Sequence, residues 1–302
     1  MSVGAAGHAV AADAASHAGA AIPAGHADGL LDLRFVRAAS GRTELAERAQ
    51  RFPLRLTTPM YLDPADRGLA FVYVQNPTGG LFGGDRLLTR LRVGPGARVH
   101  LTTQAATRAY RMEADAVGRQ RCELELGEGA FVEYAPDPLI PQAGSRVEQE
   151  LAVTVGKGAV FLGVESLAPG RLARGESFAY HRVRLAVEAR GPDGRELCAE
   201  TLLLEPGRRS PKARGLLGAY PYLGSLLAVA PGCAADALAD QLDDALADAP
   251  GALAGAGALP GGAGAFARVL ACSPGALREA LDCAWAVARG SLVGLPLPPR
   301  RK

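Results

Sequence analysis

Side chains that could act in acid–base chemistry or hold a metal ion are spread along the chain rather than gathered in a known motif. The acidic candidates are Asp137, which stands between two prolines, Glu165 and Glu176. After residue 28 the only histidines are His100 and His181, and each lies among residues typical of strands. No Ser-His-Asp or Cys-His arrangement, no His-Glu-x-x-His and no Gly-x-Ser-x-Gly motif is present. The residue chemistry alone therefore indicates a scaffold rather than an enzyme.

The most unusual segment is 76–85, where four glycines occupy six positions just before Asp85. A P-loop would need Lys and then Ser or Thr after its last glycine, but Asp85 and Arg86 follow here. The dinucleotide-binding fingerprint also fails, because the spacing is wrong and no helical pattern follows. The segment therefore predicts a sharp turn or the close approach of another backbone segment, and Asp85 is expected either to bind a ligand or to cap this turn.

Two groups of basic residues accompany the acids. Arg171 and Arg174 lie within five residues of Glu176, so an ion pair is the simpler expectation for this glutamate. A second basic run surrounds Pro211 and consists of Arg208, Arg209, Lys212 and Arg214. This run predicts a solvated loop, with a docking patch as the alternative.

The composition limits the classes of protein to which the chain can belong. Of its 302 residues 48% are hydrophobic, but only 5% are aromatic, so a core must be built mainly from Val, Leu and Ala. The net charge of +2 argues against nucleic acid or an anionic membrane as the main partner. The 38 glycines and 21 prolines exceed average usage without reaching the level of a low-complexity chain. The length fits one domain of about 250 residues with a tail.

The cysteines and the N-terminal residues indicate a reducing compartment. The five cysteines include no Cys-x-x-Cys pair, which argues against a disulfide framework and a thiolate zinc site, so we expect them to be buried as small hydrophobic residues. Residues 1–28 lack the features of a signal peptide and predict a disordered Ala/Gly/His tail. No uncharged stretch is apolar enough for a membrane helix. We therefore predict a cytoplasmic protein without a membrane anchor.

The tail holds three of the five histidines, His8, His17 and His26, each nine residues from the next. Imidazoles are good ligands for divalent first-row metals, so a tail that collects metal is one hypothesis. A spacing of nine fits no helix face, however, and chance clustering is the simpler explanation.

From Arg34 to Pro206 the pattern predicts one strand after another. Polar and apolar residues alternate in 121–126 and 182–188, which gives each strand one buried and one solvated face. Three turns share the pattern Gly-x-Gly-Ala, at 94–97, 127–130 and 156–159, and a looser turn follows at 191–194. This degenerate repeat favours a solenoid-like stack of β units, with an ordinary β-sandwich as the alternative.

The C-terminal third predicts two helices. In residues 233–249 Leu238, Leu242 and Leu246 form an apolar stripe, and the opposite side carries Asp236, Asp240, Asp244 and Asp248. The acids are expected to face solvent, and they are our candidate for a partner-binding surface. Residues 249–264 predict a flexible Ala/Gly/Pro connector. A second helix is predicted over 274–289, with Ser273 as N-cap and Gly290 as its end.

Several segments, taken in order, resemble one family. They are Gly41-Arg42-Thr43 with 53–56, the glycine-rich 76–85, Leu-Thr-Thr-Gln-Ala-Ala-Thr-Arg-Ala-Tyr at 101–110, Glu-Tyr-Ala-Pro-Asp-Pro-Leu-Ile-Pro at 133–141 and Gly-Arg-Leu-Ala-Arg-Gly-Glu at 170–176. The set resembles the urease accessory protein UreD, called UreH in some organisms, strongly over about residues 30 to 205. A C-terminal segment around Trp285 and Arg289 matches more weakly.

The resemblance implies a mainly β fold. Residues 29–302 should form a single domain with a right-handed β-helical, solenoid-like body and two C-terminal α-helices. It also implies a non-catalytic scaffold that binds urease apoprotein, UreF and UreG, where UreG is the GTPase that delivers nickel. No tightly bound cofactor is implied. Ni²⁺ would instead be in transit through a water-filled passage in the body.

Carried over residue by residue, the resemblance suggests stations on that path. Asp85, Asp137 and Glu176 are the predicted metal-contacting residues, and His100 could join them. Oxygen and imidazole ligands suit an ion that must be held weakly, whereas a thiolate cage would trap it. Two alternatives stay open: a β-solenoid enzyme with carboxylates in a groove, and a structural adaptor that never touches metal.

Overall fold

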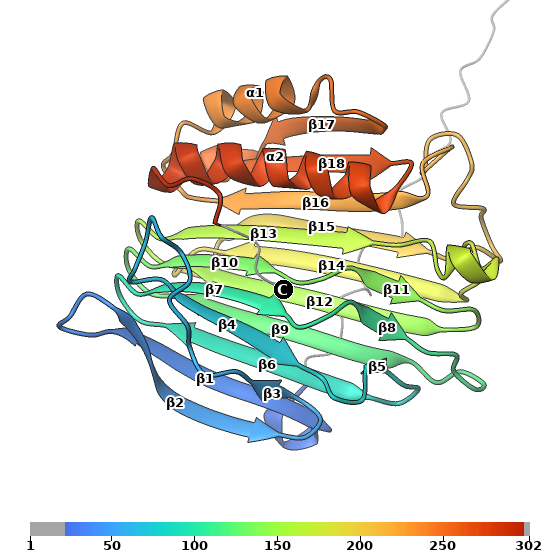
Figure 1. The fold of residues 1–302 in the computed structure, drawn as a ribbon, viewed down its shortest axis with the longest axis horizontal. Coiled ribbons are helices and arrows are strands. Elements are labelled where there is room, and N and C mark those ends of the chain that lie inside the picture. Colours follow the sequence, from blue (N-terminus) through green and yellow to red (C-terminus); the bar gives the residue numbers. More distant parts are fainter. Residues whose placement is uncertain (1–21, 299–302) are drawn as a thin grey trace, which may run out of the picture.

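The computed structural model describes residues 22–298, which form a β-solenoid of about four turns (Figure 1). One wall is a seven-stranded sheet, sheet A. In spatial order it consists of β15 (Glu196–Leu204), β14 (Arg182–Arg190), β12 (Arg146–Val155), β9 (Gly118–Leu126), β6 (Arg86–Val93), β1 (Gly29–Arg37) and β2 (Thr43–Arg51). The five inner strands run parallel, and β2 and β15 close the edges antiparallel. The predicted solenoid-like stack is confirmed.

The facing wall is sheet B. Its main path consists of β17 (Ala252–Ala258), β18 (Gly264–Ala271), β16 (Tyr222–Val229), β13 (Val160–Leu167), β10 (Phe131–Ala135), β7 (Arg98–Thr103), β4 (Ala70–Gln75) and β3 (Arg55–Leu56). Three short strands, β5 (Gly80–Leu81), β8 (Thr107–Ala109) and β11 (Leu139–Pro141), stack on one another at one end of the body. They continue the strands of sheet B toward the loops that lead back to sheet A.

The two ends of the solenoid are built differently. At one end the Gly-x-Gly-Ala turns connect sheet A to sheet B, and Gly96, Gly129 and Gly158 take φ values of 62°, 62° and 64°. These left-handed conformations are why glycine recurs at this position. At the other end, on the right in Figure 1, longer loops return the chain to sheet A, and one of them contains the short helix η2 (Leu172–Arg174).

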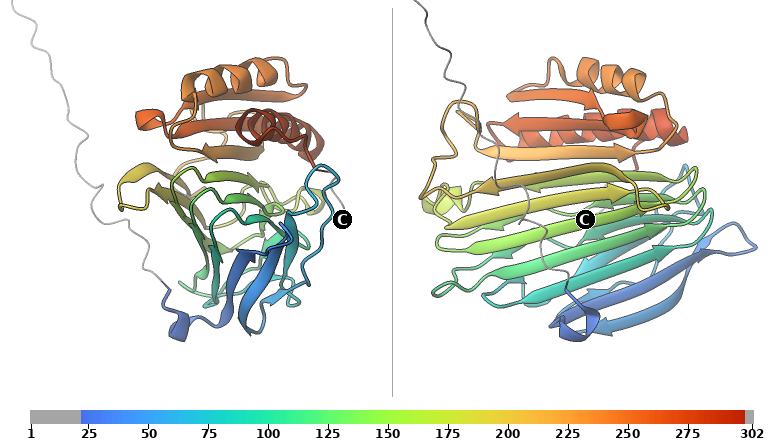
Figure 2. Two further views of the ribbon diagram at one scale, coloured as in Figure 1. Left: turned by 90° about the vertical axis from the view of Figure 1, so that its left-hand side faces the viewer. Right: turned by 180° about the vertical axis from the view of Figure 1, so that it is seen from behind.

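Two apolar layers hold the fold together. The larger one fills the space between the sheets and is dominated by Leu and Val, with Ala completing it, as the composition predicted. The second lies between the outer face of sheet B and two helices, α1 (Ala235–Leu246) and α2 (Pro274–Val293). Figure 2 shows both sheets as facing walls, with the helices packed over the C-terminal strands.

Both C-terminal helices are confirmed, but the bounds of both differ from the prediction, and α1 covers Ala235–Leu246 rather than 233–249. The leucine stripe of α1 is buried and its four predicted aspartates are exposed. Ser273 caps α2, because its Oγ accepts a hydrogen bond from the Ala276 backbone N–H at 3.1 Å. The helix does not end at Gly290 as predicted. It continues to Val293 and ends at Gly294, whose φ of 67° supplies the left-handed cap.

The predicted flexible connector at 249–264 is wrong. Residues 252–258 form β17, which pairs antiparallel with β18 at the edge of sheet B, and Pro260–Gly262 form a 3-10 turn, η3. Ala252, Ala254 and Ala256 pack against the apolar layer under the helices. An Ala/Gly run has low strand propensity, but packing under α1 and the ladder to β18 override it.

Two further expectations need correction. Residues 22–28 do not belong to a tail: they include the turn η1 (Ala24–His26), and Ile22 and Ala27 pack against Leu88 on the outer face of sheet A. The tail prediction for residues 1–21, with His8 and His17, lies outside the described residues. Among the cysteines only Cys122 is buried, and Cys272 and Cys283 are exposed. Within residues 22–298, no helix is both long and apolar enough to span a membrane.

Candidate functional site

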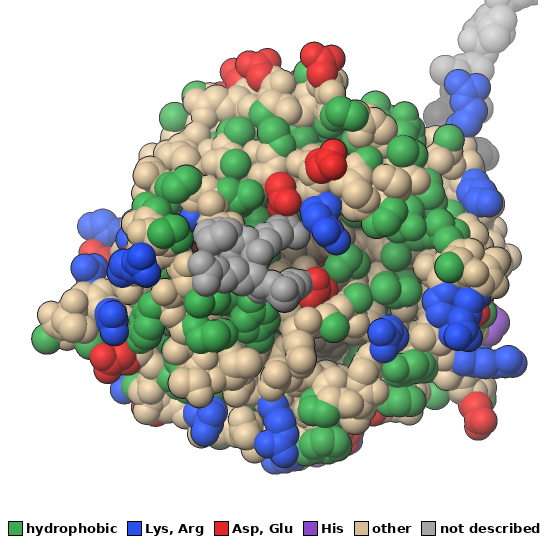
Figure 3. Space-filling view, in the orientation of Figure 1, with side chains coloured by type: hydrophobic (Ala, Val, Ile, Leu, Met, Phe, Trp, Pro, Cys, Tyr) green, Lys and Arg blue, Asp and Glu red, His purple; other side chains and the backbone are tan. Residues whose placement is uncertain are grey.

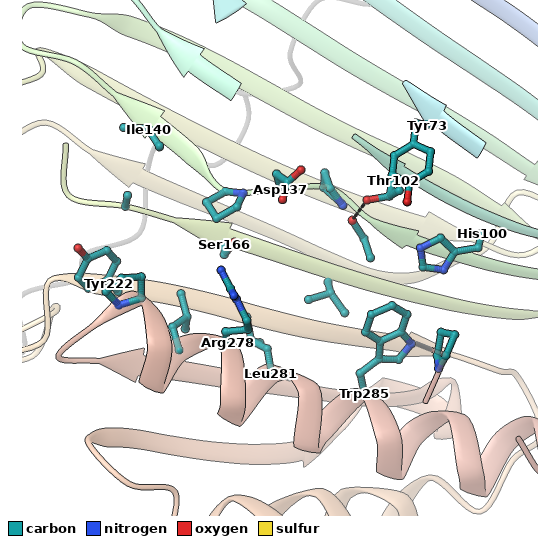
Figure 4. A pocket seen from close by; sticks show the side chains of 18 of the residues that line it. Tyr73, His100, Thr102, Asp137, Ile140, Ser166, Tyr222, Arg278, Leu281 and Trp285 are labelled. Atoms are coloured by element: carbon teal, nitrogen blue, oxygen red, sulfur yellow. Dashed lines mark hydrogen bonds between the residues drawn. The ribbon is translucent and has the colours of Figure 1, made fainter. Parts of the chain in front are cut away.

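A cavity of about 300 Å³ opens on the outer face of sheet B, beside α2 (Figure 4). Its walls come from strands β4, β7 and β13 and from helix α2. Because successive side chains of a strand point to opposite faces of the sheet, every second residue of these strands points outward. Residues from these four elements that line it include Tyr73, His100, Ser166, Leu281 and Trp285. The lining is mainly apolar, with a few polar groups, as is usual for sites that bind small ligands.

Asp137 is held at this cavity by the break between β10 and β11. Pro136 and Pro138 cannot donate to the ladder, so the sheet pairing stops at Ala135 and resumes at Leu139. In this break the Thr103 hydroxyl accepts a hydrogen bond from the Asp137 backbone N–H at 2.8 Å and donates one to Asp137 Oδ2 at 3.2 Å. The local sequence therefore fixes a carboxylate where the wall of sheet B opens.

His100 lines the same cavity and is held as an aromatic sandwich. Its ring stacks on Phe71 at a centroid distance of 4.0 Å and on Trp285 at 5.5 Å. Its Nδ1 lies 3.1 Å from Glu133 Oε2, so this nitrogen is engaged in a hydrogen bond within the protein. The opposite edge of the ring is the part that can meet a cavity occupant.

Behind His100 lies a buried network of charges that fixes α2 to sheet B. Glu133 is fully buried, and its Oε1 accepts a hydrogen bond from Trp285 Nε1 at 2.8 Å. Arg289, also fully buried, places Nε 3.0 Å from the same oxygen and pairs with Asp63. Such buried charges are tolerated only when each is paired, so the helix is locked in place by complementary groups.

Two smaller cavities continue from this site into the space between the sheets. The first, about 20 Å³, shares Pro136, Asp137 and Ser166 with the large cavity. The second, about 30 Å³, shares Glu165 and Ser166 with the first. Each has room for a water molecule and each is lined by polar groups. We call the three together the cavity series.

Glu165 is the central carboxylate of the cavity series. It is enclosed between the sheets, and burial raises its pKa to about 7. Cys122 is buried and Tyr134 is partly buried beside it, and loss of hydration also raises the pKa values of the thiol and of the phenol. The positive charge of Arg268 opposes the shift at Glu165. At neutral pH this carboxyl group can therefore either keep or release its proton.

The inner end of the cavity series reaches the edge of sheet A. Arg268 of β18 forms an ion pair with Glu200 of β15, and both line the cavity of about 30 Å³. The Glu200 side chain is 38% exposed, so this end lies close to solvent. The series therefore leads from the outer face of sheet B to the open edge of the solenoid, with carboxylates at Asp137, Glu165 and Glu200.

Of the four residues predicted to contact metal, Asp137 and His100 lie in one cavity, and Asp85 and Glu176 do not line the series. Asp85 caps its turn, accepting a hydrogen bond from the Phe82 backbone N–H at 2.9 Å, which is one of its two predicted roles. Glu176 pairs with Arg171, as expected, and accepts a hydrogen bond from Ala143 N–H at 3.2 Å. The arginine lowers the pKa of Glu176.

The predicted partner face on α1 is exposed as a row of acids. Asp236, Asp240 and Asp244 are exposed on α1 and Asp248 is exposed just beyond its end; acidic side chains are seen at the top of Figure 3. Asp243 has a different role, because its Oδ1 accepts a hydrogen bond from Ala256 N–H at 3.1 Å on the edge of β17. The binding role of this face stays a prediction.

Several residues of the cavity series carry no recognisable signal in the sequence. Glu165 stands out only as one more scattered acid, and Glu200 and Arg268 occupy ordinary strand positions. Their inward direction depends on strand register rather than on a motif. Within the described part of the chain no group of three or more His, Cys, Asp and Glu side chains is placed to hold a metal ion.

Comparison with known proteins gives a consistent match over nearly the whole chain. The family described as "UreD urease accessory protein" matches residues 27–302. A urease accessory protein UreD 2 from Streptomyces griseus is 43% identical over 279 residues, covering 91% of this chain and 93% of the relative. A UreD from Mycolicibacterium gilvum is 39% identical, covering 80% of this chain and 87% of the relative. A third UreD, from Haloarcula marismortui, is 36% identical, covering 91% of this chain and 90% of the relative.

Proposed function

The chain belongs to the UreD family of urease accessory proteins, with a role in urease maturation, and from this we propose that it is a non-catalytic scaffold for nickel insertion. In this proposal it forms a complex with UreF, UreG and urease apoprotein in the cytoplasm. GTP hydrolysis belongs to UreG, which agrees with a glycine-rich segment here that lacks the P-loop lysine.

The cavity series supports a second part of the proposal, that Ni²⁺ travels through the body of the protein. Carboxylates recur along it at Asp137, Glu165 and Glu200, separated by space for water. An ion in transit needs binding that is favourable enough to enter and weak enough to leave. Single oxygen ligands spaced along a hydrated path meet both conditions, since no single position encloses the ion.

Reconstitution tests the scaffold role. Urease apoprotein is incubated with Ni²⁺, bicarbonate, GTP, UreF and UreG, with and without this chain, and urease activity and bound nickel are measured. Activity should appear only when the chain is present. Equal activation without it would overturn the proposed function.

The nickel route is tested separately. Glu165→Gln keeps the size of the side chain but removes its charge, and Glu196→Gln, an exposed change near the start of β15, is the matched control. Glu165→Gln should leave assembly of the complex intact and slow nickel incorporation, whereas the control should not. Normal incorporation by Glu165→Gln would favour a scaffold that does not carry the ion.

A further inference from the structure

The end of the solenoid opposite the Gly-x-Gly-Ala turns is a stack of loops that meets the cavity series only at Ala168 and Gly170. Residues 76–85, 110–117, 142–145 and 168–181 lie there, each joined to the next by backbone hydrogen bonds such as Gly84 N–H to Val117 O and Gly144 N–H to Ala179 O. Two of the segments that carry the family resemblance, 76–85 and 170–176, lie at this end. The fold therefore gathers them into one exterior surface.

This end carries an excess of free positive charge. Within the described residues, none of six exposed basic side chains here forms an ion pair, and these are Arg108, Arg111, Arg174, Arg209, Lys212 and Arg214. The last three reach this end because β15 runs antiparallel to β14 and delivers the chain beside the start of β14. Figure 3 shows blue side chains at this end, on the right of the molecule, as well as on the left. Exposed arginines without partners leave their donors free for a second molecule.

The basic side chains adjoin one another across successive loops. Arg111 packs against Gly144, where an added Cβ would lie 3.2 Å from its Cγ. The neighbouring Ala143 N–H donates to Glu176, and Glu176 pairs with Arg171, three residues before Arg174. Contacts between neighbouring loops therefore connect the segments that carry Arg111 and Arg174 and place them at the same end of the body.

Large apolar side chains stand between these arginines. Phe82 is 45% exposed and stacks on Tyr110 at a centroid distance of 4.7 Å, two residues from Arg108. Leu172, on the helix η2 between Arg171 and Arg174, is 41% exposed. Arginine and aromatic residues are enriched where proteins bind proteins, because both offer large contact areas with directional groups.

The acids at this end only partly balance the charge. Asp85 and Glu176 are engaged in the contacts described above, and Glu205 pairs with Arg208. Glu113 and Asp115 are the exposed acids, and they lie on the loop after Met112, at the border of the surface. Six basic side chains outside any ion pair therefore outnumber two exposed acids at this end, although the charge of Arg174 also acts on Glu176.

We propose that this basic end, defined by Arg108, Arg111 and Arg174 with Phe82 and Leu172, is a docking surface for an acidic protein partner. The inference rests on the proposed scaffold role, which requires the chain to hold other proteins. The partner should present carboxylates to the arginines and small apolar hollows to Phe82 and Leu172. It is a different surface from the acidic face of α1, so the chain can bind two proteins of opposite surface charge at once.

The test is charge reversal, with purified urease apoprotein and UreF as separate probes in a binding assay at low and high salt. The triple variant Arg108→Glu, Arg111→Glu and Arg174→Glu should weaken binding of one probe by about tenfold or more, because like charges then face the acidic partner. Binding by the unchanged protein should weaken as salt rises. The matched control reverses three exposed basic residues at the opposite end, Arg67, Lys157 and Arg195, and should bind as the unchanged protein does.

The outcomes separate this inference from the proposed function. If the triple variant is folded, binds both probes normally and supports nickel incorporation, the docking surface is wrong and the scaffold role stands. If the unchanged chain does not support incorporation at all, the proposed function fails whatever the basic end binds. Binding of RNA or of anionic vesicles through these arginines, with protein binding unaffected, would also overturn the proposal.

Discussion

Burial changes the chemistry of a single side chain most strongly at Glu165. An isolated carboxylate between two sheets loses its hydration, and only Arg268 offsets the cost, so the pKa of Glu165 rises to about 7. At Glu176 the opposite occurs, because the adjacent arginine favours the charged form and lowers its pKa. Two glutamates eleven residues apart therefore behave differently, and only the one inside the body can exchange a proton near neutral pH.

The raised pKa of Glu165 predicts a pH-dependent stability. Between pH 4.5 and 7 the folded state holds a proton that the unfolded state has lost, so the free energy of unfolding falls as pH rises. The loss should approach about 3 kcal/mol above pH 7. Urea unfolding from pH 5 to 8 measures it. Glu165→Gln should remove this part of the slope, and an unchanged slope in that variant would show that Glu165 is not the titrating group.

Elements are positioned by a few residues that no neighbouring residue could replace. The Gly-x-Gly-Ala turns depend on left-handed glycines, and α2 depends on Arg289 and Trp285 to reach Glu133 in sheet B. Because Arg289 fixes α2 against sheet B, it also holds the helix wall of the cavity in place. Substitution of the buried arginine and substitution of the turn glycines should therefore cost different amounts of stability.

Removing the anchor should be expensive. Arg289→Met leaves Asp63 and Glu133 buried with fewer partners and should lower the free energy of unfolding by about 3–5 kcal/mol. Arg278→Met, an exposed change on the same helix, should cost no more than about 0.5 kcal/mol. Chemical denaturation of both variants compares them. Equal stability of the two would contradict a structural role for the buried network.

The glycines of the body should differ in their tolerance of alanine. At Gly129 (φ 62°) nothing lies within 4 Å of an added Cβ, so alanine should cost only about 1–2 kcal/mol for the left-handed backbone. At Gly264 an added Cβ would lie 2.0 Å from the Ala228 carbonyl oxygen, so alanine should break the β16–β18 pairing. Thermal unfolding should separate the two variants by well over 5 °C. Similar midpoints would refute the steric argument.

At the scale of the whole molecule, local sequence patterns predicted the stacked strands but not the residues that line the cavities. Alternation in 121–126 and the repeated glycine turns are short-range patterns, so the stacked strands could be predicted from them. The strand at Ala252–Ala258 could not, because its Ala/Gly side chains become strand-like only beneath α1. Glu165 and Glu200 are 35 residues apart, and only the closing of the solenoid places both along one series of cavities.

The family resemblance carried information that the spacing did not. It led to the UreD assignment, which the match over residues 27–302 confirms. It also pointed to Asp137 and His100, which share a cavity, and to Asp85 and Glu176, which lie outside the cavity series. Residues of one motif can serve folding or function, and the two are separated only when the side chains are seen in place.

The most direct test of the account blocks the cavity series without touching its charges. Ser166 lines all three cavities, and the two inner ones hold only about 20 and 30 Å³, so Ser166→Leu should fill the junction between them. Nickel bound per urease active site is then measured after reconstitution with this variant, and with the exposed Ser40→Leu as control. We predict that Ser166→Leu assembles normally with its partners, yet leaves urease with no more nickel than when the chain is omitted. Full nickel loading through the blocked body would contradict the account.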